Sequence, residues 1–366
     1  MESPLFPVVT SKSHSILRND GSRCSDRRET KRRGGIGLLL LSREQILSVF
    51  SMRDAIEADK KAFVLHTEGR AKVPLRINLE TEDGSGQCMF MPAYVGGLNM
   101  AGVKMVSFFP GNAGKGLPVV PATVPLIDGA TGLVIAIVEG TTLTQIRTAA
   151  IAGAATELLS NPDSSTGALF GTGGQAPAQL EALLTVRPLK EVRVFDIDPE
   201  RVRTFTKKNA PLAERFGAAL VAAESPGHAV DGADVITTVT TSREPVFEGD
   251  RIKPGCHING IGAYTPSMRE IPADILQRAA CVFVDNREAV LAEAGDLIIP
   301  MNEGLFSEER ITGELGELIL GKVAGRENRE DITVMKTVGF ATLDIVTAAA
   351  IVEKARAAGV GTEVEL

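Results

Sequence analysis

A glycine-rich turn between a short apolar run and a helix-forming stretch is the feature that most constrains how this 366-residue chain can fold. The turn has the pattern Gly171-x-Gly173-x-x-Ala176, follows the apolar residues 167–170 and precedes residues 176–186, which have helical character. In this setting the first glycine permits a tight turn, the second lets a pyrophosphate approach the backbone, and a small third residue lets the helix pack closely on the strand. The pattern predicts a strand, a turn and a helix that together bind a dinucleotide.

A second predicted strand, residues 191–196, ends in an acidic residue 25 positions after the first glycine of the turn. Asp196 is therefore expected to accept hydrogen bonds from an adenosine ribose, with Asp198 as the fallback. A carboxylate there repels a 2′-phosphate and favours NAD(H), whereas Arg201 and Arg203 would admit NADP(H) by turning toward that phosphate. The alternative role for Asp196 is to cap the helix that follows.

The second half of the chain alternates strands with helices. After the glycine-rich unit, short strands are predicted at residues 234–237, 257–259 and 281–285, with helical stretches between them. Such alternation is typical of a doubly wound parallel sheet. We therefore predict an α/β protein with a Rossmann NAD(P)-binding domain at residues 151–339.

The first half has a mixed α+β pattern. We predict a capped helix at residues 42–63, strands at 73–79, 87–91 and 102–109, a strand pair at 118–128 and 133–139, and an alanine-rich helix at 141–159. A last helix at 343–358 lies past the final predicted strand and is expected to pack back on this half. The predicted first domain is therefore residues 36–150 with 340–366, and the length fits two domains at roughly 100–200 residues each.

Charge divides the chain into a basic start and an acidic body. The first 35 residues hold eight Lys or Arg and four acids, a charge of +4, so the remainder carries −11 of the total of −7. The acidic body argues against nucleic acid as a partner. We predict that residues 1–35 form a disordered extension, with a targeting segment as the alternative. Residues 38–41 are too few to cross a membrane, so no membrane partner is expected.

Three basic residues of the first half stand in apolar or glycine-rich surroundings: Arg76, Lys104 and Arg147. A cation in such a place is costly unless it is paired, either with a buried acid or with an anionic ligand. Their common appearance ahead of a dinucleotide-binding domain favours a site for a carboxylate or phosphate.

Other chemistries find little support in the sequence. The four histidines lack ligand spacing and none of the four cysteines lies in a C-x-x-C pair, so we predict no metal and a reducing, cytoplasmic setting. His66 and His228 are interpreted as solvated, and His257 as a satisfied core residue. No serine or cysteine has the setting of a nucleophile, so hydrolysis through a covalent intermediate is not supported.

Several short motifs follow one another in a fixed order: GVK at 102–104, PGN at 110–112, GLP at 116–118, QIRTAA at 145–150, GTGGQA at 171–176, TTSREPVF at 240–247 and KTVG at 336–339. Their order and spacing resemble those of the ornithine cyclodeaminase/mu-crystallin family over residues 36–366. The resemblance implies a homodimer whose first domain, completed by the last helix, supplies the subunit interface and the substrate pocket.

The resemblance also implies roles for individual residues. Arg76 and Lys104 would hold the substrate carboxylate, with Val338 near the substrate. Beside the glycine turn itself, the implied cofactor contacts are Arg147, Gly174, Gln175, Asp196, Thr237, Ile258, Asn259, Gly260, Ile261 and Thr337.

Two departures from the ornithine cyclodeaminase pattern shape the predicted activity. Those enzymes carry an aspartate that exchanges a proton with the substrate amine, followed four residues later by a lysine, and this chain has Tyr264 and Met268 there. Cyclodeamination needs a base, and tyrosine, with an ordinary pKa of ~10, is a poor one. Reduction of a cyclic imine needs only hydride and a proton.

We therefore predict an NAD(P)H-dependent reductase of cyclic ketimine amino acids, such as Δ1-pyrroline-2-carboxylate or Δ1-piperideine-2-carboxylate, which yields proline or pipecolate. Arg76 would clamp the substrate carboxylate. Lys104 would pair with it and assist proton delivery, and Tyr264 would line the pocket and bond to the imine nitrogen.

Three alternatives stay open. The first is ornithine cyclodeaminase activity in which Asp296 or Glu293 replaces the missing acid. The second is reductive amination of the kind that alanine dehydrogenase performs. The third is a crystallin-like protein that binds NAD(P)H without turnover, against which the intact Arg76 and Lys104 weigh.

Overall fold

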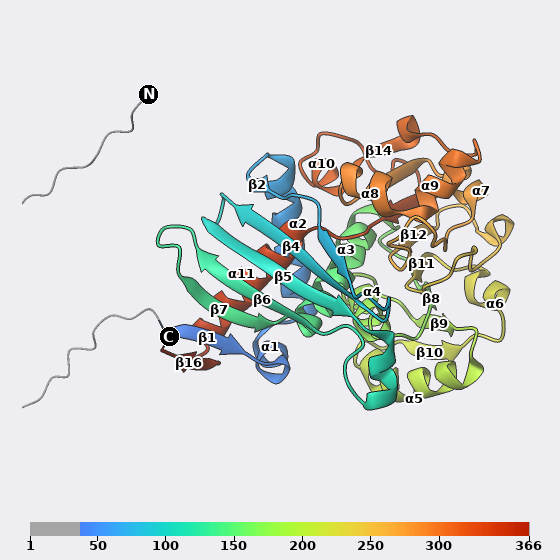
Figure 1. Cartoon of the computed structure of the whole chain (residues 1–366). Coiled ribbons are helices and arrows are strands. Elements are labelled where there is room, and N and C mark those ends of the chain that lie inside the picture. The colour runs from blue at the N-terminus through green and yellow to red at the C-terminus, as the bar shows by residue number, and fades with distance from the viewer. Residues whose placement is uncertain (1–36, 366) are drawn as a thin grey trace, which may run out of the picture. The chain divides into compact units, whose positions relative to one another are not determined.

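In the computed structural model, which describes residues 37–365, the chain folds around two β-sheets (Figure 1). The first is a mixed sheet in the order β16-β1-β7-β6-β5-β4-β2, with β3 also paired to β4. Its strands are β1 (Leu38–Leu41), β2 (Ala71–Lys72), β3 (Ile77–Glu80), β4 (Gln87–Val95), β5 (Met100–Phe108), β6 (Ala122–Asp128), β7 (Val134–Glu139) and β16 (Thr362–Val364). The strand pairs are antiparallel except for β1 with β7.

Helices cover one face of the first sheet: α1 (Arg43–Val49), α2 (Met52–Thr67), α3 (Gly140–Leu159) and α11 (Ala341–Ala357). Along β4, Met89, Met91 and Ala93 are buried while the residues between them are more exposed, as expected when alternate side chains point to opposite faces. The last helix, α11, packs against α2, β4 and β5. The C-terminal end of the chain therefore completes the core that its first part begins.

The second sheet is parallel throughout and has the order β10-β9-β8-β11-β12-β15-β13-β14. Its strands are β8 (Thr166–Phe170), β9 (Glu191–Phe195), β10 (Ala219–Ala222), β11 (Val235–Thr238), β12 (His257–Gly260), β13 (Cys281–Val284), β14 (Ile311–Glu314) and β15 (Thr333–Lys336). The order reverses between β8 and β11, and ligands bind at such switch points, beyond the carboxyl ends of the strands. The predicted α/β class with a doubly wound parallel sheet is confirmed.

The helices of this half are α4 (Ala176–Val186), α5 (Pro199–Arg215), α6 (Pro226–Val230), α7 (Ala273–Arg278), α8 (Arg287–Glu293), α9 (Gly295–Asn302) and α10 (Leu315–Ile319). Short 3₁₀ helices are η1 (Pro110–Lys115), η2 (Gly249–Arg251) and η3 (Glu308–Arg310). The predicted glycine-rich unit is present as β8, a turn and α4. Because α3 contacts both α2 and α4, the predicted domain division at residue 150 falls inside a helix that the two halves share.

The start of the chain differs from its prediction in two ways. The single helix predicted at 42–63 is two helices, because Ser42 with Gln45 and Ser51 with Asp54 each form a capping box that starts a helix. The strand predicted at 73–79 is broken: residues 73–76 lie outside strands between β2 and β3. Proline has no N–H to donate to a ladder, and Pro74 lies within this break.

Several short strands escaped prediction: β1, β10, β14, β15 and β16. None is longer than four residues, which is too short for an alternating pattern to stand out. One of them, β16, follows α11 and pairs with β1, so the last helix does not lie past the final strand. Another, β15, lies between β12 and β13 and delivers residues 337–339 to the carboxyl edge of the sheet.

The predicted basic extension at residues 1–35 lies outside the described residues. Across residues 37–365, the helices are all too short or too polar to cross a membrane.

Candidate active site

The glycine turn has the shape that a dinucleotide requires. Gly171 has a φ of +97°, and a Cβ atom there would lie 2.7 Å from the carbonyl oxygen of Val239, so only glycine fits. A Cβ on Gly173 would instead enter open space, with no atom within 4 Å. At the N-terminus of α4, Gln175 makes no side-chain cap, the amide of Ala176 donates to the carbonyl oxygen of Gly173, and Pro177 has no amide hydrogen, so the open backbone at Gly173 is the part that an anionic ligand can approach. The turn therefore fits a pyrophosphate.

Asp196 lies at the end of β9 and is held by the turn itself. Its carboxylate accepts hydrogen bonds from Thr172, at 3.0 Å from the amide and 2.6 Å from the hydroxyl. The helix cap of α5 is Asp198, which accepts from the amides of Glu200 and Arg201, so the capping role considered for Asp196 belongs to Asp198. Arg201 approaches Asp196 to 3.8 Å.

Arg203, the second arginine considered for NADP(H), forms an ion pair with Glu200. Both groups are mostly exposed, so this pair is weak and leaves Arg203 able to move.

A cavity of about 360 Å³ lies between the carboxyl edge of the second sheet and strands β4 and β5 of the first. It gathers most of the predicted site residues, although they come from distant parts of the chain. Those that line it are Arg76, Lys104, Arg147, Gly173, Gly174, Gln175, Ile261, Tyr264, Thr337 and Val338.

Two of the predicted cations share one buried acid at the base of the cavity. Lys104 of β5 lies 2.9 Å from both carboxylate oxygens of Asp344, and Nε of Arg147 donates to the same carboxylate at 2.9 Å. Lys104 is 2% exposed and Asp344 is fully buried. Asp344 belongs to α11 and Arg147 to α3, so the cluster joins three elements.

Burial and neighbouring charge change how this cluster titrates. Burial and the positive charge of Arg147 lower the pKa of Lys104 to about 7, although Asp344 opposes the shift. Burial alone would raise the pKa of Asp344, but Arg147 and Lys104 hold that pKa below its ordinary value. Lys104 can therefore gain or lose a proton near neutral pH while Asp344 stays ionised.

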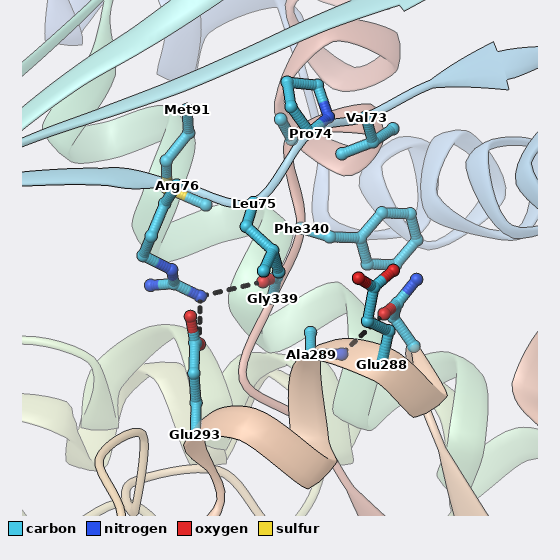
Figure 2. A pocket seen from close by; sticks show the side chains of 12 residues that line it. Val73, Pro74, Leu75, Arg76, Met91, Glu288, Ala289, Glu293, Gly339 and Phe340 are labelled. Carbon is cyan, nitrogen blue, oxygen red and sulfur yellow. Dashed lines mark hydrogen bonds and ion pairs between the residues drawn. The ribbon is translucent and has the colours of Figure 1, made fainter.

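Arg76 faces the cavity from the irregular segment ahead of β3. Its Nη2 donates to the carbonyl oxygen of Val338 at 3.2 Å. The same Nη2 donates to the carbonyl oxygen of Gly339 at 3.1 Å and pairs with Glu293 at 2.7 Å (Figure 2). Within residues 37–365, Nε and Nη1 have no hydrogen-bond partner, so they remain available to a carboxylate ligand.

Apolar side chains, among them Met89, Met91, Val106, Phe108 and Val239, make up most of the remaining surface of the cavity, and the polar groups between them include Gln145, Gln175 and six threonines. Burial raises the pKa of Tyr264, which keeps its hydroxyl protonated at neutral pH, although the charge of Arg76 acts the other way. Among the described residues that line the cavity, none is Asp or Glu.

The two acids considered as substitutes for the missing base have other partners. Asp296 is fully buried, lies 2.8 Å from Nζ of Lys336, and accepts from the amides of Glu270 and Ile271. It does not line the cavity. Glu293 lines a small neighbouring pocket on the other side of the Arg76 guanidinium, and burial raises the pKa of its carboxyl.

Some implied cofactor residues do not reach the cavity with their side chains. Thr237, Ile258 and Asn259 are fully buried, and Asn259 Nδ2 donates to Thr156 at 2.9 Å and to Thr237 at 3.3 Å. The side chains of these three residues therefore pack in the core, and a cofactor contact at these positions stays a prediction that only their backbone could fulfil. Gly260, buried at the end of β12, and Ala176, buried at the start of α4, offer backbone only.

His257 is satisfied in the core, as predicted: it lies 2.8 Å from the Thr333 hydroxyl and 3.0 Å from Asn259 Oδ1. The prediction that His66 is solvated is wrong. Its ring packs at 4.7 Å on Phe340 and its Nε2 lies 2.9 Å from Asn286. The last turn of α2 faces α11 and the second half there, which the local pattern did not reveal. His228 is exposed, in α6.

Sequence reasoning missed the acids that organise the site. Asp344 lies among apolar residues of α11, and this was the available sign of a buried counter-ion for the cations. Asp285 directly follows β13 and accepts from the amides of Val338 at 3.1 Å and Gly339 at 2.6 Å, which fixes the carbonyls that hold Arg76. The described residues contain no cluster of three or more side chains suited to a metal.

Comparison with known proteins gives consistent matches. The model of the ornithine cyclodeaminase/mu-crystallin family matches residues 38–359. A Δ1-pyrroline-2-carboxylate reductase of Bacillus cereus is 35% identical over 328 residues, which cover 90% of this chain and 100% of that protein.

Two solved structures are similar over the same range. A Thermococcus litoralis Δ1-pyrroline-2-carboxylate reductase in complex with NADH and L-proline has a TM-score of 0.84 and 39% identity, covering 89% of this chain and 100% of that one. An archaeal alanine dehydrogenase dimer with bound NAD has a TM-score of 0.82 and 33% identity, and the match covers 90% of this chain and 99% of that one.

The Asp344 cluster generates a stability prediction. Asp344→Asn leaves Lys104 and Arg147 buried without the carboxylate that they share, so it should lower the free energy of unfolding by roughly 3–5 kcal/mol. Asp163→Asn, which removes an exposed partner of Arg329, should cost at most about 1 kcal/mol. Urea unfolding of both variants measures the difference, and equal small losses would contradict the role given to Asp344.

Proposed function

The chain belongs to the ornithine cyclodeaminase/mu-crystallin family, and we propose that within it this protein is an NAD(P)H-dependent reductase of cyclic imino acids. The observation that carries the proposal is the composition of the cavity. Three cations, Arg76, Lys104 and Arg147, line it, its other walls are mainly apolar, and its described lining includes no carboxylate. Such a site suits a small, flat anion with an apolar ring.

In the proposed reaction, Δ1-pyrroline-2-carboxylate or Δ1-piperideine-2-carboxylate accepts a hydride at the C=N carbon and a proton at nitrogen, giving proline or pipecolate. The free Nε and Nη1 donors of Arg76 bind the substrate carboxylate, and its Nη2 stays fixed on the backbone of residues 338–339. Val338 borders the substrate from that segment.

Lys104 is the proposed proton donor. Its Nζ is buried at the cavity, and burial lowers its pKa to about 7, which suits a group that must hold a proton and then release it near neutral pH. The Nζ–H bond would break as the N–H bond of the product forms, directly or through a water. Tyr264 lines the same cavity, and its hydroxyl would bond to the imine nitrogen and orient the ring.

The residues of the glycine turn fit a dinucleotide. The backbone of Gly171 and Gly173, at the positive end of the α4 dipole, would hold the pyrophosphate, with Gly174, Gln175 and Thr337 beside the cavity. NADH or NADPH supplies the hydride when bound. Asp196 would accept from the ribose and favour NADH, although Thr172 already occupies part of its carboxylate. Arg201, the neighbour of Asp196, keeps NADPH as an alternative.

Ornithine cyclodeamination is less well supported by the geometry. That reaction needs a base at the substrate amine, yet the Tyr264 hydroxyl is protonated at neutral pH. Asp296 is fully buried, pairs with Lys336 and does not line the cavity, and Glu293 pairs with Arg76. A cyclic imine requires no such base, because its nitrogen takes up a proton.

We also propose a homodimer. Ile77, Phe90 and Met105 are aligned across β3, β4 and β5 on the face opposite the helices, and Ile77 is 54% exposed. An exposed apolar row of this kind is typical of an interface. The archaeal relative crystallised as a dimer. The cytoplasmic location stays a prediction of the sequence.

The substrate proposal predicts the outcome of a cofactor-oxidation assay. With NADH or NADPH, cyclic imines should be reduced with a kcat/KM at least roughly tenfold above that for pyruvate with ammonia. Ornithine with catalytic NAD⁺ should release no ammonia. Conversion of ornithine to proline with cyclic imines untouched would contradict the proposal, and tight NADH binding without any turnover would favour a binding protein.

The role of Lys104 predicts a pH profile. A donor acts only while it holds its proton, so kcat/KM for imine reduction should fall by about tenfold per pH unit above pH 7. Lys104→Ala should abolish turnover while retaining NADH binding, and Lys104→Arg should move any residual decline to higher pH.

The exposed Lys190 offers a matched control, since Lys190→Ala should leave the profile unchanged. The profile is measured by initial rates from pH 5.5 to 9.5 with correction for ionisation of the imine. A decline that persists unaltered in the Lys104 variants would remove Lys104 from the proton transfer.

A further inference from the structure

Three loops from the carboxyl edge of the second sheet border the cavity, and one group of buried charges connects them. The loops are residues 239–241 after β11, 261–264 after β12 and 337–339 after β15. The charged residues are Glu270, Asp296 and Lys336, all fully buried. None of them lines the cavity, and the reaction described above uses none of them.

Glu270 bonds to two of these loops through their backbones. Its Oε1 accepts from the amide of Thr240 at 2.6 Å, and its Oε2 accepts from the amides of Gly262 at 2.7 Å and Ala263 at 2.9 Å. Ala263 directly precedes Tyr264, whose side chain lines the cavity. One carboxylate therefore holds the backbone next to Tyr264 against the loop after β11.

The third loop joins the same network through Asp296. One oxygen of Asp296 accepts from the amides of Glu270 and Ile271, at 2.6 and 2.9 Å, and the other lies 2.8 Å from Nζ of Lys336. Lys336 ends β15, immediately before Thr337. Five backbone N–H donors bond to the two buried carboxyl groups, which is the compensation that buried polar groups need. Burial and the neighbouring Asp296 raise the pKa of Glu270, whereas Lys336 and the amide of Thr240 lower it.

The backbones of the two loops that Glu270 joins lie as close to each other as their atoms allow. A Cβ atom on Gly262 would lie 2.1 Å from the carbonyl oxygen of Thr240, so only glycine allows this spacing. Without the carboxylate, three amides would lose their acceptor, and the loops would separate to reach other partners. Tyr264 would then shift relative to Arg76 and Lys104.

We propose that Glu270 is a positioning residue for imine reduction, which acts through the backbone at Ala263 to set Tyr264 over the bound imine. The proposal rests on the reductase function. Misplacement of an orienting group by about 1 Å can cost a large factor in rate without preventing binding. The expected defect is therefore in kcat rather than in binding.

The primary test is Glu270→Gln, because an amide cannot accept from all three N–H groups. We expect kcat for cyclic imine reduction to fall roughly tenfold or more, with the imine KM and the NADH Kd within about threefold of wild type. Glu303→Gln, at an exposed glutamate, should change none of these values. A Glu270→Gln enzyme with wild-type kcat, or one that loses only NADH affinity, would overturn the proposal.

A double-mutant cycle asks whether the effect passes through Tyr264. If it does, Glu270→Gln combined with Tyr264→Phe should be no slower than the slower single variant, whereas multiplied losses would overturn the proposed route.

Gly262→Ala is the second variant, and it tests the same proposal if the Glu270→Gln protein does not fold. It forces the loops apart with every charge retained, so it should reproduce the loss of kcat at unchanged NADH affinity, measured by cofactor fluorescence. Wild-type kcat in this variant would overturn the proposal.

The failure of this proposal can be told apart from the failure of the reductase function. Wild-type protein that reduces no cyclic imine would contradict the reductase function. An active wild type with an equally active Glu270→Gln variant would contradict the role of Glu270 alone.

Discussion

The ion cluster of Lys104, Arg147 and Asp344 is the constraint on which the arrangement of the rest depends. Its members come from β5, α3 and α11, which lie far apart in the sequence. Two buried cations without a counter-ion would be prohibitive, so the last helix must return to the first sheet with Asp344. That return brings the loop after β15 over the cavity, because only four residues separate β15 from α11. The core of the first half and one wall of the active-site cavity are thus built by the same return of the chain.

Buried acids perform a second task, which is to fix loop backbones at the carboxyl edge of the parallel sheet. Asp285 holds residues 338–339, and Glu270 holds residues 240 and 262–263. Side chains that face the cavity can then be apolar or cationic, because the acids lie one layer below and act through amides. A carboxylate bonded to several N–H groups is well stabilised without facing solvent. The site therefore keeps its positive character toward an anionic substrate in an acidic protein.

The sequence was informative where function depends on local backbone shape. The glycine turn, α4 and the position of Asp196 followed from spacing, since each requirement is met within a few residues. The partners of the cations could not be predicted from spacing, because Lys104 and Asp344 lie 240 positions apart and no periodicity links them. Strands such as β15 were missed for a related reason: four residues buried among neighbouring strands need no pattern of their own. Thr237 and Asn259 show a further limit, since the resemblance implies cofactor contacts at two positions whose side chains pack in the core.

The charge of the substrate and the proton on Lys104 are coupled in the proposed mechanism. In the cavity without ligand, burial and Arg147 bring the pKa of Lys104 to about 7. A carboxylate bound to Arg76 adds negative charge to the same cavity, which favours the protonated form of Lys104 and raises that pKa. By linkage, the protonated enzyme binds the anion more tightly. Once hydride addition turns the imine into a basic secondary amine, the proton on Lys104 has an acceptor. The same buried lysine therefore promotes binding of the anion before reduction and supplies the proton during it.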